Sequence, residues 1–375
     1  MSGIYIHVPF CKRRCGYCNF YSSTLFNLKD DYLDAIKKEI VLRCNYLDTE
    51  VKTIYFGGGT PSLLSVNEIQ NIITLLKDCF TIADNAEITI EANPDDLTTN
   101  YIENLAKSNV NRLSIGIQSF NNNMLTFMNR RHNSQQAIDA ITYSQKNGFN
   151  NISIDLIYGL PNMTLNEWQK QLDIVENLNV QHLSAYHLTY EEGTAFGKKL
   201  EQHQLEEIPE EESLAQFDIL TNWAKKIGFE HYEISNFAKE NFRSKHNSNY
   251  WNGTPYLGIG PAAHSFNITT RSWNCANVKE YIENIRKGKN INEIETLTTA
   301  DKFNDYVITS LRTIEGINLN YLHNNFPSTM TTYLEKQASC FITNNKLKIE
   351  QNHLKLTHDG IFISDKIMQE LIYIE

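Results

Sequence analysis

Three cysteines near the start of the chain have the spacing that most strongly indicates chemistry. Cys11, Cys15 and Cys18 form a C-x3-C-x2-C string. Thiolates this close together in sequence converge on one cluster or one soft metal ion. The basic residues 12–14 lie inside the string and would offset the negative charge of ligated thiolates. The string therefore predicts a metal centre.

The presence of three clustered cysteines, and not four, indicates which kind of metal centre they form. A structural zinc site is normally closed by a fourth cysteine or histidine. His7 lies upstream as a candidate, but no second pair of ligands follows the string. A [4Fe-4S] cluster normally has four cysteine ligands, so with three of them one iron stays open to a ligand from outside the protein. We expect an open [4Fe-4S] cluster and keep structural zinc as the alternative.

The cysteines follow the first of six segments that have the composition of β-strands. These predicted strands span residues 4–8, 53–56, 87–92, 112–117, 151–157 and 182–188. Helical periods lie between them, with capping boxes that begin at Ser65 and Thr164 and a helix end at Gly148. Alternating strands and helices predict a parallel α/β sheet, either doubly wound or an incomplete barrel. Either fold brings the residues that follow the strands to one edge of the sheet, where such folds place their sites.

The last part of the chain has a different pattern. A glycine-rich loop is predicted at residues 253–260, and polar helices follow from about residue 290. A hairpin is predicted from strands at 340–343 and 346–349, with a further strand at 353–356 and a helix from Asp359. These elements predict a smaller C-terminal α+β lobe, made of helices and a β-wing.

Composition limits the class of protein. Hydrophobic residues make up 41% and charged residues 21% of the 375 residues, which is near the globular average. The formal charge of -10 argues against binding nucleic acid by bulk electrostatics. The N-terminus lacks a signal-peptide pattern, and no apolar run approaches the roughly 18 residues of a membrane span. Seven cysteines, three of them clustered, do not form a disulfide framework, so we expect a cytoplasmic protein.

The cysteine triplet, with Tyr17 before its last cysteine, resembles the radical S-adenosyl-L-methionine (SAM) superfamily. The loop 57–60, after the second predicted strand, is similar to the glycine-rich loop with which that superfamily contacts SAM. The resemblance implies a partial (β/α)6 barrel of the TIM type. It also implies that Cys11, Cys15 and Cys18 ligate a [4Fe-4S] iron-sulfur cluster whose open iron is chelated by SAM. In this superfamily an electron from the cluster cleaves SAM to a 5'-deoxyadenosyl radical.

Further motifs resemble the coproporphyrinogen dehydrogenase and HemW branch of the superfamily. They span residues 116–120, 129–132 and 153–161. In this branch Tyr5, Gly58 and Glu91 match residues that contact a first SAM. The residues that match contacts of a second SAM are Tyr17, Gly59, Thr60, Gln118, Arg130 and Asp155. The resemblance divides the chain into a radical SAM core domain (1–235), a connecting segment (236–295) and a C-terminal HemN-like domain (296–375).

Two departures from the dehydrogenases of this branch favour the HemW type. Phe20 stands where the dehydrogenases carry a further cysteine, and only ten residues precede Cys11, where the dehydrogenases have a longer arm. The segment from His246 to Trp251 looks like the H-N-x-x-Y-W motif of HemW proteins. Because imidazole is a standard axial ligand of heme iron, the resemblance implies that His246 contacts heme. The alternative for His246 is a structural histidine.

The resemblance thus implies a heme chaperone that binds heme and delivers it to acceptor proteins, with an electron donor for the cluster. The alternative is a radical SAM oxidoreductase similar to oxygen-independent coproporphyrinogen III oxidase. Whether the chain is an enzyme stays open, because the implied fold binds SAM and could cleave it. The two departures argue against coproporphyrinogen III dehydrogenase activity.

Overall fold

Six parallel strands form the centre of a 12-stranded sheet in the computed structural model, which describes residues 1–374. They are β1 (Ser2–Val8), β2 (Val51–Gly58), β3 (Ile82–Ala92), β4 (Arg112–Gln118), β5 (Ile152–Tyr158) and β6 (His182–His187). Each strand pairs in parallel with the next one along the chain. All six strands predicted from the sequence are confirmed.

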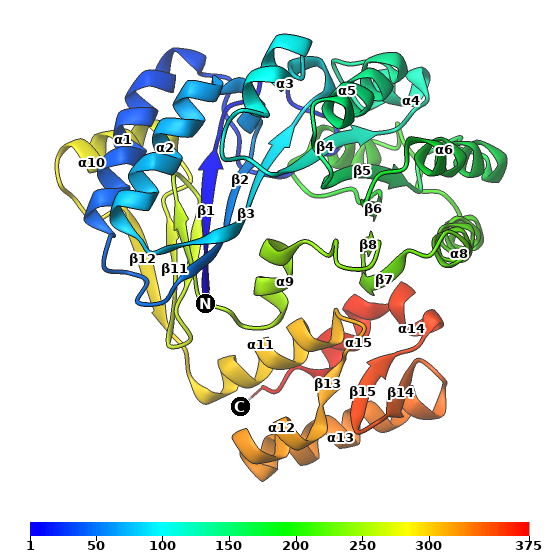
Figure 1. Cartoon of the computed structure of the whole chain (residues 1–375). Coiled ribbons are helices and arrows are strands. Elements are labelled where there is room, and N and C mark those ends of the chain that lie inside the picture. The colour runs from blue at the N-terminus through cyan, green and yellow to red at the C-terminus, as the bar shows by residue number, and fades with distance from the viewer. Residues whose placement is uncertain (375) are drawn as a thin grey trace.

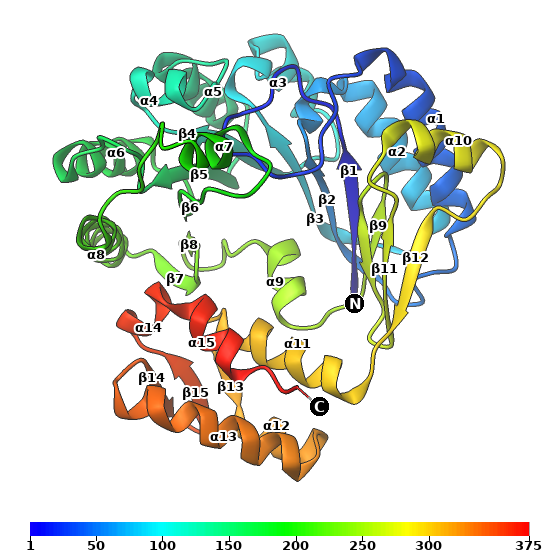
Figure 2. The same cartoon turned by 180° about the vertical axis from the view of Figure 1, so that it is seen from behind.

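Helices connect these strands and cover the outer side of the curved sheet (Figures 1 and 2). They are α1 (Lys29–Leu42), α2 (Val66–Cys79), α3 (Thr99–Leu105), α4 (Asn122–Phe127), α5 (Ser134–Lys146) and α6 (Leu165–Leu178), with 3-10 turns at Phe26–Leu28, Pro61–Leu63 and Pro94–Asp96. The capping boxes predicted at Ser65 and Thr164 are both present. The predicted helix end is also confirmed, because Gly148 follows α5 with a φ of 93°.

The strand order distinguishes between the two folds that the sequence left open. A doubly wound sheet reverses its strand order at a switch point. Here β1 to β6 follow one another in chain order, which is the order of a barrel. Within residues 1–374 the sheet ends at β12 (Asn292–Thr296) on one side and at β7 (Glu230–Glu233) on the other, so the barrel is incomplete.

The strands beyond the six parallel ones come from residues 230–296. They are β7, β8 (Asn236–Ala238), β9 (Tyr256–Ile259), β10 (His264–Phe266), β11 (Thr270–Asn274) and β12. β8 is antiparallel to β6, whereas β9 adds to β1 in parallel. The predicted loop 253–260 was therefore wrong in its second half. Two of its glycines, Gly258 and Gly260, flank a buried isoleucine that pairs into the sheet, and only this distant partner makes the segment a strand.

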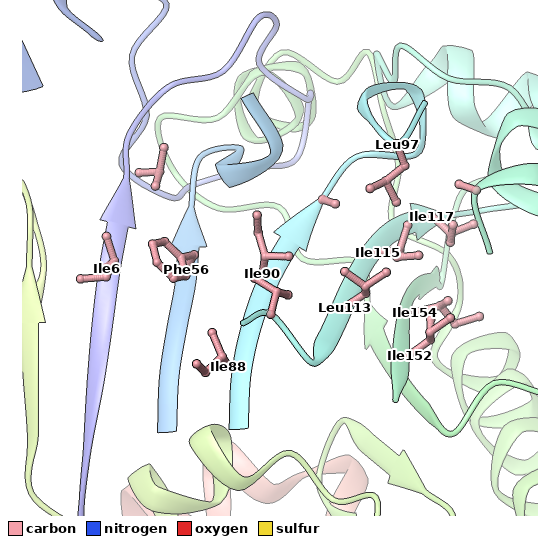
Figure 3. Close-up of a cluster of buried hydrophobic side chains, with 14 of the residues drawn as sticks. Ile6, Phe56, Ile88, Ile90, Leu97, Leu113, Ile115, Ile117, Ile152 and Ile154 are labelled. Carbon is pink, nitrogen blue, oxygen red and sulfur yellow. The ribbon is translucent and has the colours of Figure 1, made fainter. Parts of the chain in front are cut away.

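Side chains alternate along the parallel strands, with apolar residues on one face and polar residues on the other. In β2, Ile54 and Phe56 are fully buried in the main hydrophobic core, which the helices help to form (Figure 3). Thr53 and Tyr55 point the opposite way, toward the inside of the barrel, where both contact a residue of α9 (Lys245–Trp251). The corresponding positions of the other strands hold Tyr5, His7, Glu87, Glu91, Arg112, Ser153, Asp155 and His182. Since strands of fully packed parallel sheets are apolar on both faces, this inner face is suited to a polar ligand.

Four more helices complete the larger part of the molecule. They are α7 (Ala195–Glu201), α8 (Glu210–Lys226), α9 and α10 (Val278–Arg286). α9 lies on the inner side of the sheet, near the amino ends of β1 to β3 (Figure 1). The Glu87 carboxylate accepts hydrogen bonds from the backbone N–H groups of Lys245 (3.0 Å) and His246 (3.2 Å). This contact fixes the first turn of α9 against β3.

The C-terminal lobe has its own cluster of buried side chains, between Phe303 and Leu371. Its helices are α11 (Thr299–Leu311), α12 (Leu319–Asn325), α13 (Ser328–Thr343), α14 (His358–Phe362) and α15 (Ser364–Leu371). Its strands are β13 (Ile317–Asn318), β14 (Leu347–Glu350) and β15 (His353–Leu356), in the order β13-β15-β14. The domain boundaries given above stay predictions. No helix within residues 1–374 combines the length and the apolar character that crossing a membrane requires.

One predicted strand of the C-terminal lobe was wrong. Residues 340–343 are the last turn of α13, and the hairpin is formed instead by β14 and β15. The β-type residues at this helix end continue an apolar helical face that includes Leu334 and Ala338, both buried. Asn344 and Asn345 do form a turn, as predicted, but this turn ends a helix and does not join two strands. Asn345 has a φ of 54° there.

A buried carboxylate ties α1 to the segment between β9 and α10. Glu39 is 1% exposed and accepts hydrogen bonds from Tyr281 Oη (2.6 Å), Asn274 Nδ2 (2.8 Å) and the backbone N–H of Gly260 (2.8 Å). It also pairs with Arg43 at 3.3 Å. Burial raises the pKa of this carboxyl group. Three of its partners lie more than 200 residues away in the chain, so this side chain joins α1 to the segment between β9 and α10.

We expect Glu39→Ala to lower the free energy of unfolding by about 3 to 5 kcal/mol, because it leaves buried donors and a cation without their acceptor. Urea unfolding of the full-length chain measures this change. Asp34→Ala, in an exposed ion pair on the same helix, is the control and should cost less than about 1 kcal/mol. Equal effects of the two substitutions would contradict a structural role for the Glu39 network.

Candidate metal centre and cofactor site

The three cysteines lie in the loop that follows β1, at the carboxyl edge of the sheet. Backbone hydrogen bonds to three separate segments hold this loop. Cys11 N–H donates to Ser23 O (3.0 Å), Gly16 N–H donates to Met128 O (3.1 Å), and Phe196 N–H donates to Gly16 O (2.8 Å). The shape of the cysteine loop is therefore fixed by residues from early, middle and late parts of the barrel.

A single arginine from outside the loop contacts the cysteines. Arg130 Nη1 lies 3.3 Å from Cys15 Sγ, and Nη2 donates to Asn93 Oδ1 (2.6 Å) and to the Gly116 carbonyl oxygen. The sequence had instead suggested the basic residues 12–14 as the cations that offset the thiolates. Of these, Lys12 pairs with Asp96 at 3.0 Å and Arg14 donates to the Ser22 carbonyl oxygen.

The thiols do not form a ready-made site for a single metal ion. Within residues 1–374, no three His, Cys, Asp or Glu side chains converge as one bound ion requires. Around zinc, cysteine sulfurs would lie about 3.8 Å apart, whereas the thiolates of a [4Fe-4S] cluster each bind a different iron. Arg130 Nε is buried without a hydrogen-bond partner, so an unpaired donor lies beside Cys15. Such a donor suits the anionic groups that a cluster and its ligand bring.

The glycine-rich turn at the end of β2 packs directly on the cysteine loop. Gly59 N–H donates to Val8 O at 2.8 Å. A Cβ atom at Gly59 would lie 2.8 Å from Phe10 O and from Pro9 C, so no larger residue fits. Thr60 follows and is buried, with its Oγ1 at 3.5 Å from Cys11 Sγ. The turn thereby joins two of the predicted cofactor contacts to the first cysteine.

The residues expected to contact a first SAM meet around Glu91. Its carboxylate accepts hydrogen bonds from Tyr55 Oη (2.8 Å) and from Gly58 N–H (3.1 Å). The Tyr5 ring stacks on Tyr55 at a centroid distance of 6.2 Å. Burial, with a further contribution from the negative charge of Asp155, raises the pKa of Glu91 to about 7. A carboxyl group whose pKa is raised this far by its surroundings is typical of a ligand site.

Two of the residues expected to contact a second SAM lie on the next two strands, Gln118 on β4 and Asp155 on β5. Gln118 has a φ of 67°, a strained conformation for this residue type, at the end of β4. A Cβ atom at Gly116 would lie 3.0 Å from Gln118 Nε2 and 3.3 Å from Arg130 Nη2, so these side chains meet over Gly116. Burial raises the pKa of Asp155 to about 6, although Ser184 and two arginines oppose the shift. Tyr17, on the cysteine loop, packs near Phe196 with ring centroids 6.5 Å apart.

His246 lies elsewhere, at the inner end of the barrel. Its ring is 1% exposed and stacks on Tyr55 with a centroid distance of 5.0 Å. Nδ1 lies 2.9 Å from Thr53 Oγ1, and Nε2 lies 2.9 Å from Tyr250 Oη. Burial, together with the positive charge of Arg112, lowers the pKa of His246 to about 3, so the ring is neutral. Each ring nitrogen has one site for a partner and both are engaged, so iron coordination would require one hydrogen bond to break. The predicted heme contact stays a prediction.

Two inner residues of the barrel were missed by sequence reasoning, Tyr55 and Arg112. Arg112 is 1% exposed, its Nε has no hydrogen-bond partner, and its charge lowers the pKa values of Glu91 and Asp155. The signal was available, because a polar residue alternates with buried aliphatic ones at the start of a strand. In β4, Arg112 stands directly before the buried Leu113.

Comparisons with known proteins agree with this geometry. Residues 5–174 match the Radical SAM superfamily. The heme chaperone HemW of Lactococcus lactis is 30% identical over 98% of this chain and 96% of its own length, and that of Bacillus subtilis is 30% identical over 98% of both. The structure of the coproporphyrinogen III oxidase HemN from Escherichia coli superposes with a TM-score of 0.85, over 99% of this chain and 90% of its own, at 23% identity. That likeness shows the fold, including the partial barrel. The chain belongs to the HemW family of the radical SAM superfamily.

Proposed function

We propose that this protein is a cytoplasmic heme chaperone, which binds heme and delivers it to acceptor proteins. The observation that carries the proposal is the match, over nearly the whole chain, to relatives that are named heme chaperones. Delivery requires acceptor proteins, and reduction of the cluster requires an electron donor. Phe20, in place of the further cysteine of the dehydrogenases, supports the chaperone over the enzyme.

We further propose that Cys11, Cys15 and Cys18 ligate a [4Fe-4S] cluster. When bound, the cluster supplies the electron that can cleave SAM. Arg130 keeps a positive charge and an unpaired Nε beside Cys15, which favours thiolate and carboxylate ligands there. The proposed SAM contacts are Tyr5, Gly58 and Glu91 for a first molecule, and Tyr17, Gly59, Thr60, Gln118, Arg130 and Asp155 for a second.

A second candidate function is that of an oxidoreductase that acts on a porphyrinogen. The observation that favours it is the polar inner face of the barrel. Arg112 is buried inside the barrel and its Nε has no hydrogen-bond partner, so its positive charge suits a carboxylate group of a substrate.

One pair of assays separates the two functions. We expect the full-length protein, reconstituted without oxygen, to bind heme at about one equivalent, to pass it to apomyoglobin, and to leave the carboxyl groups of coproporphyrinogen III intact. Absorption spectroscopy follows the heme, and chromatography follows the porphyrinogen. Decarboxylation without heme binding would instead support the oxidoreductase.

The metal content tests the cluster in the same preparation. Wild-type protein should contain about four iron atoms and four acid-labile sulfides per chain. Cys15→Ala should lose most of both, whereas Cys340→Ala, which changes an exposed cysteine of the C-terminal lobe, should keep them. Zinc without sulfide in the wild type would contradict the cluster.

The raised pKa of Glu91 predicts how pH affects the ligand-free protein. Between its ordinary value of 4.5 and about 7, folded Glu91 holds a proton that the unfolded chain releases. The free energy of unfolding therefore falls as pH rises through this window. We expect the free energy of unfolding to fall by about 1 to 3 kcal/mol less in Glu91→Gln than in the wild type between about pH 5 and about pH 8. Urea unfolding at the two pH values measures this difference. Glu103→Gln, at an exposed position of α3, should behave as the wild type does. An unchanged pH dependence in Glu91→Gln would show that this carboxyl group is ionised throughout.

A further inference from the structure

A cavity of about 540 Å³ opens between the cysteine loop and the start of α10. Residues 21–25 line one side, residues 276–279 line the other, and Arg14 completes it. Arg14 directly precedes Cys15, so the cavity adjoins the proposed cluster. Its volume lies within the range of about 300 to 1,000 Å³ that small-molecule sites occupy.

The cavity wall carries two cations that are free to bind anions. Arg14 and Lys279 are both exposed, and neither forms an ion pair with any residue that the structure describes. The Arg14 guanidinium donates one hydrogen bond, to the Ser22 carbonyl oxygen, which leaves further N–H groups for a ligand. Two separate cations on one cavity suit a ligand with two carboxylate groups.

Exposed apolar side chains lie in the same segment of the chain as the cavity lining. Leu25, which lines the cavity, is 40% exposed, and Phe20 and Phe26, which flank the lining residues 21–25 in sequence, are 68% and 37% exposed. A local group of large exposed apolar residues indicates a binding surface. A ligand with a broad apolar face and two carboxylates matches both features, and heme has this chemistry.

Tyr21 supplies an oxygen that could bind iron at the cavity. Its Oη accepts a hydrogen bond from the Val278 N–H at 2.6 Å. A phenol oxygen has two lone pairs, so Tyr21 could bind iron and keep this hydrogen bond. His246 differs, because both of its ring nitrogens already have partners. Tyrosine is an established axial ligand of heme.

We propose that heme, as the cargo, binds in this cavity, with its two propionates on Arg14 and Lys279 and its iron on Tyr21 Oη. The inference rests on the proposed chaperone function. Coordination of ferric heme replaces a water ligand, and the phenol proton passes to solvent. The iron keeps its oxidation state, so no reductant is needed.

Titration of ferric heme into the reconstituted full-length protein tests the proposal. We expect Tyr21→Phe to retain heme with a changed visible spectrum, since it loses the phenolate ligand but keeps the ring. The double variant Arg14→Ala with Lys279→Ala should raise the Kd about tenfold, as expected for two exposed charge pairs. The matched control is Arg13→Ala with Lys289→Ala, which removes two exposed cations outside the cavity, one on the same loop and one shortly after α10.

Iron and sulfide are measured in every variant, because Arg14 neighbours a cluster ligand. If Arg14→Ala loses the cluster, Lys279→Ala alone should still raise the Kd, by about threefold. A spectrum unchanged in Tyr21→Phe, together with loss of the heme spectrum in His246→Ala, would overturn the cavity site and leave the chaperone function standing. Failure of the wild type to bind heme would instead refute the proposed function.

Discussion

The contact between Arg130 and Cys15 joins the cysteine loop to the barrel. One guanidinium reaches the thiol, the side chain of Asn93 after β3, and the Gly116 carbonyl oxygen in β4. Removing a cation from water is costly unless negative charge lies close by. Ligated thiolates supply such charge, so cluster binding and the position of this arginine should stabilise each other. The order of the loop thereby depends on the two strands that carry the predicted SAM contacts.

The polar inner face of the barrel extends this constraint. Glu91 and Asp155 both have raised pKa values, while Arg112 lies near them without an ion pair among the described residues. Burial without full pairing makes the ligand-free interior energetically unfavourable. A ligand that brings a sulfonium charge and hydrogen-bonding hydroxyl groups would relieve part of this cost. Packing of the apolar outer face against the helices stabilises the fold and offsets the cost of these buried charged groups.

The sequence was sufficient where local signals decide the structure. Alternating residues predicted all six parallel strands, whereas the roles that short motifs assign to the residues around Glu91 and Arg130 stay predictions. It was insufficient where a distant partner decides. Residues 256–259 become a strand only by pairing with β1. At residues 340–343 the β-type composition was misleading for a local reason, because these residues continue the apolar face of α13. Likewise, the motif around His246 gave no sign that Thr53, nearly 200 residues earlier, would occupy one ring nitrogen.

The location of a transported ligand can also be judged from what transport requires. A carrier must release its cargo, so it benefits from a site that solvent and acceptor proteins reach. His246 is 1% exposed and packs against Tyr55 and Tyr250, so heme could reach or leave its ring only after these side chains moved. The cavity beside Arg14 opens at the surface, where an acceptor protein can approach it. On physical grounds the rim of the barrel, next to the cysteine loop, is the better place from which to hand over heme.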